Sequence, residues 1–237
     1  MTDDASRITL RGWALILGAS SGFGEATSLA LARAGMNIFG VHLDRKGTLP
    51  NVERIVGAIR ALGREAHFFN VNAADEDKRA EVAATMEQVL KERGDLGRLR
   101  VMLHSLAFGT LKLFMADPMK EAVTKPQMDM TLDVMAHSLI YWAQEIVGRG
   151  LMAEGGRIFA MTSAGGARVL PFYGPVSAAK KIPNYEEFSR RAVERNPHRR
   201  MTTTDDVARA IVVLSHPDTY WITGNVIGVD GGEEITG

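Results

Sequence analysis

A short apolar run, a glycine-rich turn and a helical pattern follow one another near the start of the chain. Residues 13–17 (WALIL) are typical of a buried parallel strand, the turn 18–24 (GASSGFG) follows directly, and residues 25–34 have helical spacing. Glycines let the backbone approach a pyrophosphate, and the free N–H groups and dipole of the next helix face its charge. This order predicts a dinucleotide site; a tight turn without a ligand is the alternative. Its candidate coenzyme-binding residues are Gly18, Ser20, Ser21, Gly22, Phe23 and Gly24.

Strand and helix patterns alternate along most of the chain. Strands are predicted where short apolar runs occur, and helices where a helical pattern is bounded by a capping residue or a glycine. The predicted strands are 13–17, 37–43, 66–71, 100–104, 157–163 and a last one at 225–229. The predicted helices are 25–34, 51–62, 75–93, 127–149 and 204–215. This order predicts an α/β fold of the Rossmann type, with a single doubly wound parallel sheet, helices on both faces and one domain over residues 1–237.

Ligands of such a sheet bind beyond the carboxyl ends of its strands, and several polar residues fall there. Asp44, Arg45 and Lys46 follow the second predicted strand. An acid at this place can bind the ribose 2′-hydroxyl of NAD, whereas a base can bind the 2′-phosphate of NADP. Two bases against one acid favour NADP(H), with NAD(H) as the alternative, and three solvated charges are the remaining interpretation. The same edge is predicted to hold Asn70, the segment 104–107 and Ser163.

A hydroxyl, a phenol and an ammonium group lie close together in the sequence around residue 170. Ser163 ends a predicted strand, and Tyr173 and Lys180 are seven residues apart, so both can point the same way from two helical turns. A phenol has a pKa of about 10, and a nearby cationic lysine lowers that pKa and makes the phenol a usable proton donor. The three residues are therefore the candidate catalytic set; a surface Tyr and Lys beside a structural Ser is the alternative.

The composition excludes several classes of function. Basic and acidic residues both number 28, which gives no reason to expect nucleic acid or an anionic membrane as a partner. The chain has no cysteine, which excludes disulfides and thiolate metal sites and fits a reducing compartment. The six histidines show no metal-ligand spacing, so no metal site is expected. Because no signal peptide or long apolar stretch is found, we expect a cytoplasmic protein.

Four short motifs in this chain carry a resemblance to a known family. They are Gly18-x-x-x-Gly22-x-Gly24, Asn70-Val71, HSLA at 104–107 and ITGNVIGVDGG at 222–232. With them the chain resembles the short-chain dehydrogenase/reductase superfamily over nearly its whole length. The resemblance implies a homo-oligomer, either a tetramer or a dimer. It also implies a coenzyme site that includes Asp44, Arg45, Asn70, Val71, Ser105, Leu106, Ala107 and Lys180.

The spacing around Tyr173 narrows this resemblance. Ordinary members carry their tyrosine four residues before the lysine, a place that Val176 takes here, whereas Tyr173 precedes Lys180 by seven. In this spacing, and in the run Arg168-x-x-Pro-x-Tyr173, the chain is similar to enoyl-acyl-carrier-protein (enoyl-thioester) reductases. Met135 takes the place of an asparagine that many ketoreductases use, which weakens a ketoreductase interpretation.

The resemblance implies a reductase of fatty acid biosynthesis. Its substrate would be an α,β-unsaturated acyl thioester on acyl carrier protein or coenzyme A, reduced at the C=C bond with NAD(P)H. Tyr173 would stabilise the thioester oxygen, Lys180 would hold the coenzyme ribose, and Ser163 would orient the carbonyl or Tyr173. The alternatives are a ketoreductase or alcohol dehydrogenase with the same three residues, and an NAD(P)-binding paralogue without turnover.

The chain departs from the superfamily immediately after Lys180. Members continue this helix and add another strand before their substrate loop, but here Lys181-Ile-Pro-Asn-Tyr already resembles that loop. A helix, a strand and two connections would take roughly 30 residues. We therefore predict that a helix–strand segment is omitted between residues 180 and 181, rather than that the protein is a truncated paralogue.

Overall fold

The computed structural model describes residues 8–113, 115–162, 190, 193–194 and 196–235. The chain divides into two compact units. The first comprises Met1–Ser105, Ile140–Ala160 and Thr204–Asn225, and the second comprises Leu106–Leu139, Met161–Thr203 and Val226–Gly237. The single domain expected over residues 1–237 stays a prediction.

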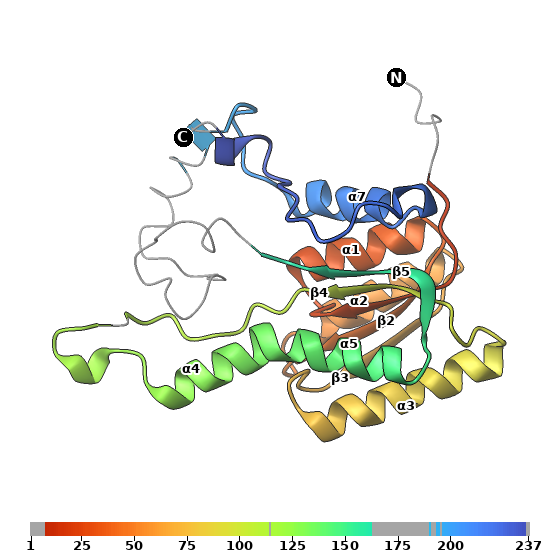
Figure 1. Cartoon of the computed structure of the whole chain (residues 1–237), viewed down its shortest axis with the longest axis horizontal. Helices are drawn as coiled ribbons and strands as arrows, with labels where there is room; N and C mark the ends of the chain where they lie inside the picture. The colour runs from red at the N-terminus through yellow and green to blue at the C-terminus, as the bar shows by residue number, and fades with distance from the viewer. Residues whose placement is uncertain (1–7, 114, 163–189, 191–192, 195, 236–237) are drawn as a thin grey trace. The chain divides into compact units, whose positions relative to one another are not determined.

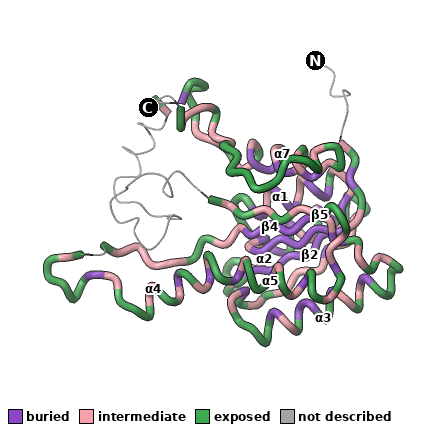
Figure 2. The backbone as a smooth tube through the Cα atoms, viewed as in Figure 1, coloured by how far each residue is buried: buried purple, intermediate pink, exposed green. Residues whose placement is uncertain are grey.

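The first unit contains a five-stranded parallel sheet with the order β3-β2-β1-β4-β5. This sheet and the helices around it confirm the Rossmann-type α/β fold. All five residues of β1 are buried, and Figure 2 shows buried residues running through the central strands, as their apolar sequences require. The strands are β1 (Trp13–Leu17), β2 (Asn37–His42), β3 (Ala66–Asn70), β4 (Leu99–His104) and β5 (Met152–Ala160).

Helices cover both faces of this sheet. Helices α1 and α7 pack together on one face, and α3 and α5 lie on the other (Figure 1). Trp142 of α5 donates its indole N–H to the Ala73 carbonyl at 2.8 Å, which ties α5 to the segment before α3. The helices of the first unit are α1 (Gly22–Arg33), α2 (Leu49–Ala61), α3 (Glu76–Arg93), α5 (Ser138–Gly148) and α7 (Thr204–Leu214).

The helix boundaries follow the capping signals in the sequence. Asp75 caps α3 by accepting a hydrogen bond from the Lys78 N–H at 2.9 Å, and Gly94 ends α3 with a φ of 68°. The long helix expected over 127–149 is instead three consecutive segments: α4 (Lys125–Leu132), the π-helix η2 (Asp133–His137) and α5. A π-helical turn adds one residue to a local turn, which the spacing of apolar residues does not reveal.

The structure corrects two strand predictions near the end of the sheet. The strand expected to be buried at 157–163 is β5, which ends at Ala160 and consists only of half-buried or exposed residues. Residues 225–229, expected as the last strand, form no strand, and Val226 is 89% exposed. The described sheet has no strand beyond β5, so β5 lies at its edge.

The second unit carries α4, η2 and the short 3-10 helices η1 (Met119–Glu121) and η5 (Glu233–Ile235). A capping box between Thr124 and Gln127 begins α4. The connection before it exposes the large apolar side chains of Phe108, Met115 and Met119. In the described part of the chain, no helix combines the length and the apolarity that crossing a membrane requires.

Candidate coenzyme site

The glycine turn joins β1 to α1 in a backbone shape that needs glycine. Gly18 has a φ of 91°, a conformation that L side chains rarely adopt. A Cβ on Gly24 would lie 2.0 Å from the Gly18 carbonyl oxygen, so only glycine allows the start of α1 to approach the turn this closely. The N–H groups of Gly18 and Ala19 donate to the Val41 carbonyl at 2.8 and 3.0 Å, which fixes the turn against β2.

Helix α1 begins at Gly22 and directs its first N–H groups to the carboxyl edge of the sheet. Ser21 precedes it in an extended conformation and makes no side-chain capping bond. The Ser20 carbonyl accepts a hydrogen bond from the Asn51 side chain at 2.7 Å, so α2 also holds the turn. Orphan N–H groups and the positive end of the helix dipole make this turn suited to a pyrophosphate.

Asp44 follows β2 and is held by donors on several sides. Its side chain is only 12% exposed, and His42 Nδ1 lies 2.9 Å from Oδ2. Burial raises the pKa of Asp44, but hydrogen bonds from Thr48, Ser20 and His42 outweigh this effect and hold the pKa below its ordinary value. Asp44 is therefore a carboxylate at neutral pH, beside Ser20 of the glycine turn.

Asn70 at the end of β3 locks the backbone of Asp44. Its side-chain oxygen accepts from the Asp44 N–H at 2.9 Å, and its side-chain nitrogen donates to the Asp44 carbonyl at 3.0 Å. The Val71 N–H donates to the His42 carbonyl at 2.8 Å, and the Ser105 N–H donates to the Leu17 carbonyl at 2.9 Å. The ends of β1, β2, β3 and β4 are thus connected along one edge.

The structure brings most of the predicted coenzyme residues of the first unit to this edge. Arg45 is exposed and makes no ion pair with any residue that the structure describes. Leu106 and Ala107 belong to the second unit.

The described residues do not include the catalytic candidates Ser163, Tyr173 and Lys180. The junction of residues 180 and 181 also lies outside them.

Sequence reasoning missed the groups that support Asp44. His42 Nδ1 lies 2.9 Å from its carboxylate, and Thr48 helps to lower its pKa. The available signal was spacing, because a side chain two residues before Asp44 on a strand points to the same side of the sheet. Gly40, two residues before His42, leaves room for the Phe68 ring and Ala19. A Cβ on Gly40 would lie 2.8 Å from the Phe68 ring and 2.9 Å from Ala19.

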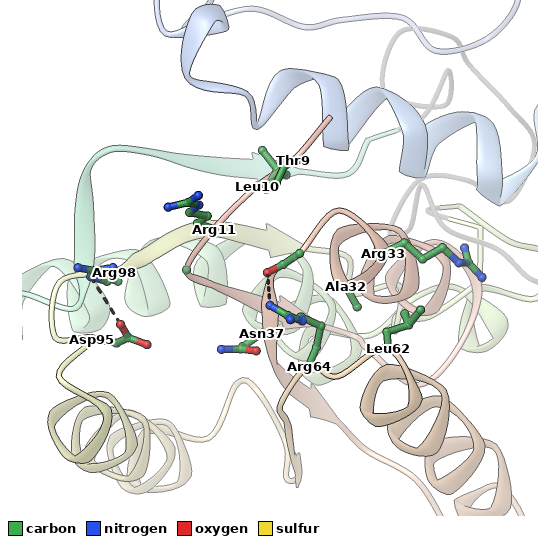
Figure 3. Close-up of a pocket in the computed structure, with 12 residues that line it drawn as sticks. Thr9, Leu10, Arg11, Ala32, Arg33, Asn37, Leu62, Arg64, Asp95 and Arg98 are labelled. Carbon is green, nitrogen blue, oxygen red and sulfur yellow. Dashed lines mark hydrogen bonds and ion pairs between the residues drawn. The ribbon is translucent and has the colours of Figure 1, made fainter. Parts of the chain in front are cut away.

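A hollow of about 460 Å³ lies at the opposite edge, where Asn37 begins β2 and Arg98 precedes β4 (Figure 3). Four arginines and one acid line it, and Arg64 donates to the Gly35 carbonyl at 3.2 Å. The acid, Asp95, already accepts from the Trp13 indole at 3.0 Å. Because ligands of parallel sheets bind at the carboxyl ends, this hollow is not the coenzyme site.

Comparison with known proteins agrees with the fold and the turn. The family model described as Enoyl-(Acyl carrier protein) reductase matches residues 18–182 and 174–234. Versicolorin reductase stcU of Emericella nidulans is 24% identical over 92% of this chain and 94% of its own length. The 3-oxoacyl-acyl-carrier-protein reductase FabG of Thermotoga maritima is 23% identical over 92% of this chain and 96% of its own.

Solved structures show the same fold. A promiscuous reductase that catalyses keto-reduction in lugdunomycin biosynthesis has a TM-score of 0.79 at 22% identity, covering 97% of this chain and 100% of its own. An NADH-dependent enoyl-acyl-carrier-protein reductase from Aquifex aeolicus has a TM-score of 0.77 at 18% identity. The match covers 98% of this chain and 99% of that reductase.

The parallel sheet and its glycine turn are those of a dinucleotide-binding α/β protein. With the family match, the chain belongs to the short-chain dehydrogenase/reductase superfamily, which includes enoyl-acyl-carrier-protein reductase-like members. The fold implies NAD(P) binding. The relatives above include reductases named for carbonyl substrates, so the comparisons support an oxidoreductase without choosing between C=C and C=O reduction.

Proposed function

We propose that this protein reduces the C=C bond of an α,β-unsaturated acyl thioester with NAD(P)H. The observation that carries the proposal is the seven-residue spacing of Tyr173 and Lys180 after Ser163, within a chain that matches the enoyl reductase family model. The glycine turn and Asp44 supply the coenzyme side of the site. The acyl carrier would be acyl carrier protein or coenzyme A, and the assembly a homotetramer or a dimer in the cytoplasm.

Each catalytic candidate has a distinct role in this proposal. The bound coenzyme supplies a hydride, which adds to the β-carbon of the substrate. Negative charge then develops on the thioester oxygen, where the Tyr173 hydroxyl stabilises it by a hydrogen bond before the α-carbon takes a proton. Lys180 holds the ribose hydroxyls and keeps the phenol polarised, and Ser163 orients the carbonyl or Tyr173.

A ketoreductase or alcohol dehydrogenase is the second candidate. The named activities of the relatives favour it, since versicolorin reductase and FabG stand among them. In that reaction Tyr173 would protonate the oxygen of the carbonyl that takes the hydride. Met135 at the place of the ketoreductase asparagine weakens this candidate, and η2 puts Met135 in a π-helical turn.

A protein that binds NAD(P) without turnover is the third candidate. The aligned stretch with versicolorin reductase stcU spans 266 residues, more than the 237 of this chain, so that relative has residues without a counterpart here. Superfamily members have a helix and strand after the active-site lysine, so a true deletion there would remove part of the substrate pocket. Such a loss would leave the coenzyme edge intact.

One assay separates the three candidates. NADPH and NADH oxidation is followed by absorbance with crotonyl-CoA and with acetoacetyl-CoA in parallel. The proposal requires faster turnover of crotonyl-CoA. Preference for acetoacetyl-CoA would establish the ketoreductase, and coenzyme binding without turnover of either would support the third candidate.

For the coenzyme we propose NADPH, because Arg45 and Lys46 are exposed and both can reach a 2′-phosphate. Asp44 opposes this choice, since its charge repels a phosphate. Arg45→Ala should lower the preference for NADPH over NADH several-fold, in line with the ~0.2–1 kcal/mol of an exposed charge pair. An unchanged ratio of kcat/KM values would remove Arg45 as the cause.

A further inference from the structure

We propose that His42 is a positioning residue for coenzyme selection: it fixes the Asp44 carboxylate toward the ribose and thereby sets how strongly the site discriminates NADH from NADPH. The inference rests on the proposed coenzyme site. It concerns a residue that touches Asp44 and that none of the sequence motifs includes.

The His42 ring is buried next to β3. Its side chain is 3% exposed, and its ring lies 6.1 Å from the Phe68 ring of β3. Phe68 in turn fills the space that Gly40 leaves open between the two strands. The His42 ring is therefore held by the sheet, and it presents Nδ1 to the Asp44 carboxylate from a fixed place.

The charge of Asp44 fixes the direction of this hydrogen bond. An ionised carboxylate only accepts hydrogen bonds, so the proton between His42 and Asp44 must be on Nδ1. Hydrogen bonds from Thr48 and Ser20 act on the same carboxylate. A carboxylate has about four lone-pair sites, so the bond from His42 leaves sites open for a ribose hydroxyl.

The consequence concerns the 2′-position of the ribose. A carboxylate held in one orientation can accept a bond from a 2′-hydroxyl, but it repels a 2′-phosphate at the same place. Without His42 the carboxylate keeps its charge but loses the donor that lies 2.9 Å from Oδ2, and it can turn away from the ribose. Binding of NADPH should therefore improve relative to NADH.

The test measures dissociation constants of NADH and NADPH by fluorescence titration, without turnover. His42→Phe keeps a ring but removes the donor, and we expect the NADPH-to-NADH affinity ratio to rise about tenfold, as loss of a hydrogen bond to a charged group predicts. His42→Asn places an amide nitrogen near the position of Nδ1 and should restore the wild-type ratio. His67→Phe, which changes another histidine of the same sheet, is the matched control and should leave the ratio unchanged.

A double-mutant cycle shows whether His42 acts through Asp44. In an Asp44→Asn background, His42→Phe should produce no further change in the ratio. Equal shifts in the two backgrounds, or an unchanged ratio in His42→Phe, would overturn the inference while leaving the proposed function intact. Wild-type protein that binds neither coenzyme would overturn both.

A measurement on the wild-type protein keeps the inference testable if His42→Phe does not fold. Nitrogen-15 NMR of the histidine ring reports which nitrogen carries the proton. We expect a proton on Nδ1 of His42, and a ring protonated only on Nε2 would contradict the hydrogen bond that carries the proposal.

Discussion

The two edges of the parallel sheet hold their charged groups in opposite ways. At the carboxyl edge, the Asp44 carboxylate accepts a hydrogen bond from the buried His42, and Asn70 fixes the Asp44 backbone. At the amino edge, four arginines line an open hollow with a single acid (Figure 3). Among the residues that the structure describes, Arg11 and Arg33 in this hollow have no ion-pair partner.

This difference shows that the coenzyme edge is defined by backbone shape and fixed polar groups rather than by a deep hollow. The glycine turn gives access to N–H groups and the surrounding side chains restrict one carboxylate to one place. Exposed arginines keep their rotamer freedom and are screened by salt, so they define no geometry. Function should therefore depend on the carboxyl edge and stability only weakly on the amino edge.

The largest expected effect is on turnover at the carboxyl edge. Tyr173→Phe removes the hydroxyl proposed to stabilise the thioester oxygen, and it should lower kcat by about a hundredfold or more, as loss of an oxyanion donor does. Coenzyme affinity should change little. The matched control is Tyr185→Phe, and near-full crotonyl-CoA reduction by the Tyr173 variant would refute the assignment.

The glycine turn should be the next most sensitive place. Gly24→Ala puts a Cβ 2.0 Å from the Gly18 oxygen, so the turn must move. We expect a loss of about 1–3 kcal/mol in the free energy of unfolding, measured by urea denaturation, together with much weaker coenzyme binding. Gly57→Ala is the control, since a Cβ there would meet no atom within 4 Å outside the backbone of its own helix and its two chain neighbours, and alanine should stabilise helix α2. Similar effects of the two substitutions would contradict the steric account.

Sequence reasoning found the elements of this edge but not their connections. The strand 13–17 is predicted to the residue and the helix 75–93 to within one residue of α3, because apolar runs and charged first and last turns are local signals. The hydrogen bonds that join Asn70 to Asp44 depend on the register of β2 and β3, which no single pattern records. The last strand was predicted wrongly at 225–229, since a strand needs a neighbour as well as an apolar sequence.

The hydrogen bonds at Asp44 also predict how stability changes with pH. The pKa of Asp44 in the folded protein lies below its ordinary value of 3.8, so the unfolded chain binds the proton more tightly. The carboxylate therefore contributes stability above that ordinary value, and this contribution is lost as the pH falls through the lower, folded-state pKa. Asp44→Asn should cost about 1 kcal/mol at pH 7, with the difference in melting temperature from wild type shrinking below pH ~4. A difference that stays constant across this pH range would show that the charge of Asp44 has no part in it.

The smallest expected effects lie at the amino edge, where two arginines of the same hollow should respond with opposite signs. The Arg98 guanidinium lies 3.5 Å from Asp95, so Arg98→Ala removes an attractive pair. The backbone of Gly12, the residue after Arg11, lies close to the backbone of Arg98. Arg11 makes no ion pair with the described residues, so Arg11→Ala removes only repulsion between the like charges of the arginines in this hollow. We expect Arg98→Ala to lower the melting temperature slightly and Arg11→Ala to leave it unchanged or raise it, with each change in the free energy of unfolding within about 0.5 kcal/mol.

Both differences should fade in 1 M salt, where charges are screened beyond about 3 Å, and coenzyme affinity should stay the same in both variants. A loss of coenzyme binding in either one would mean that the two edges are coupled, and the contrast between them would then be wrong.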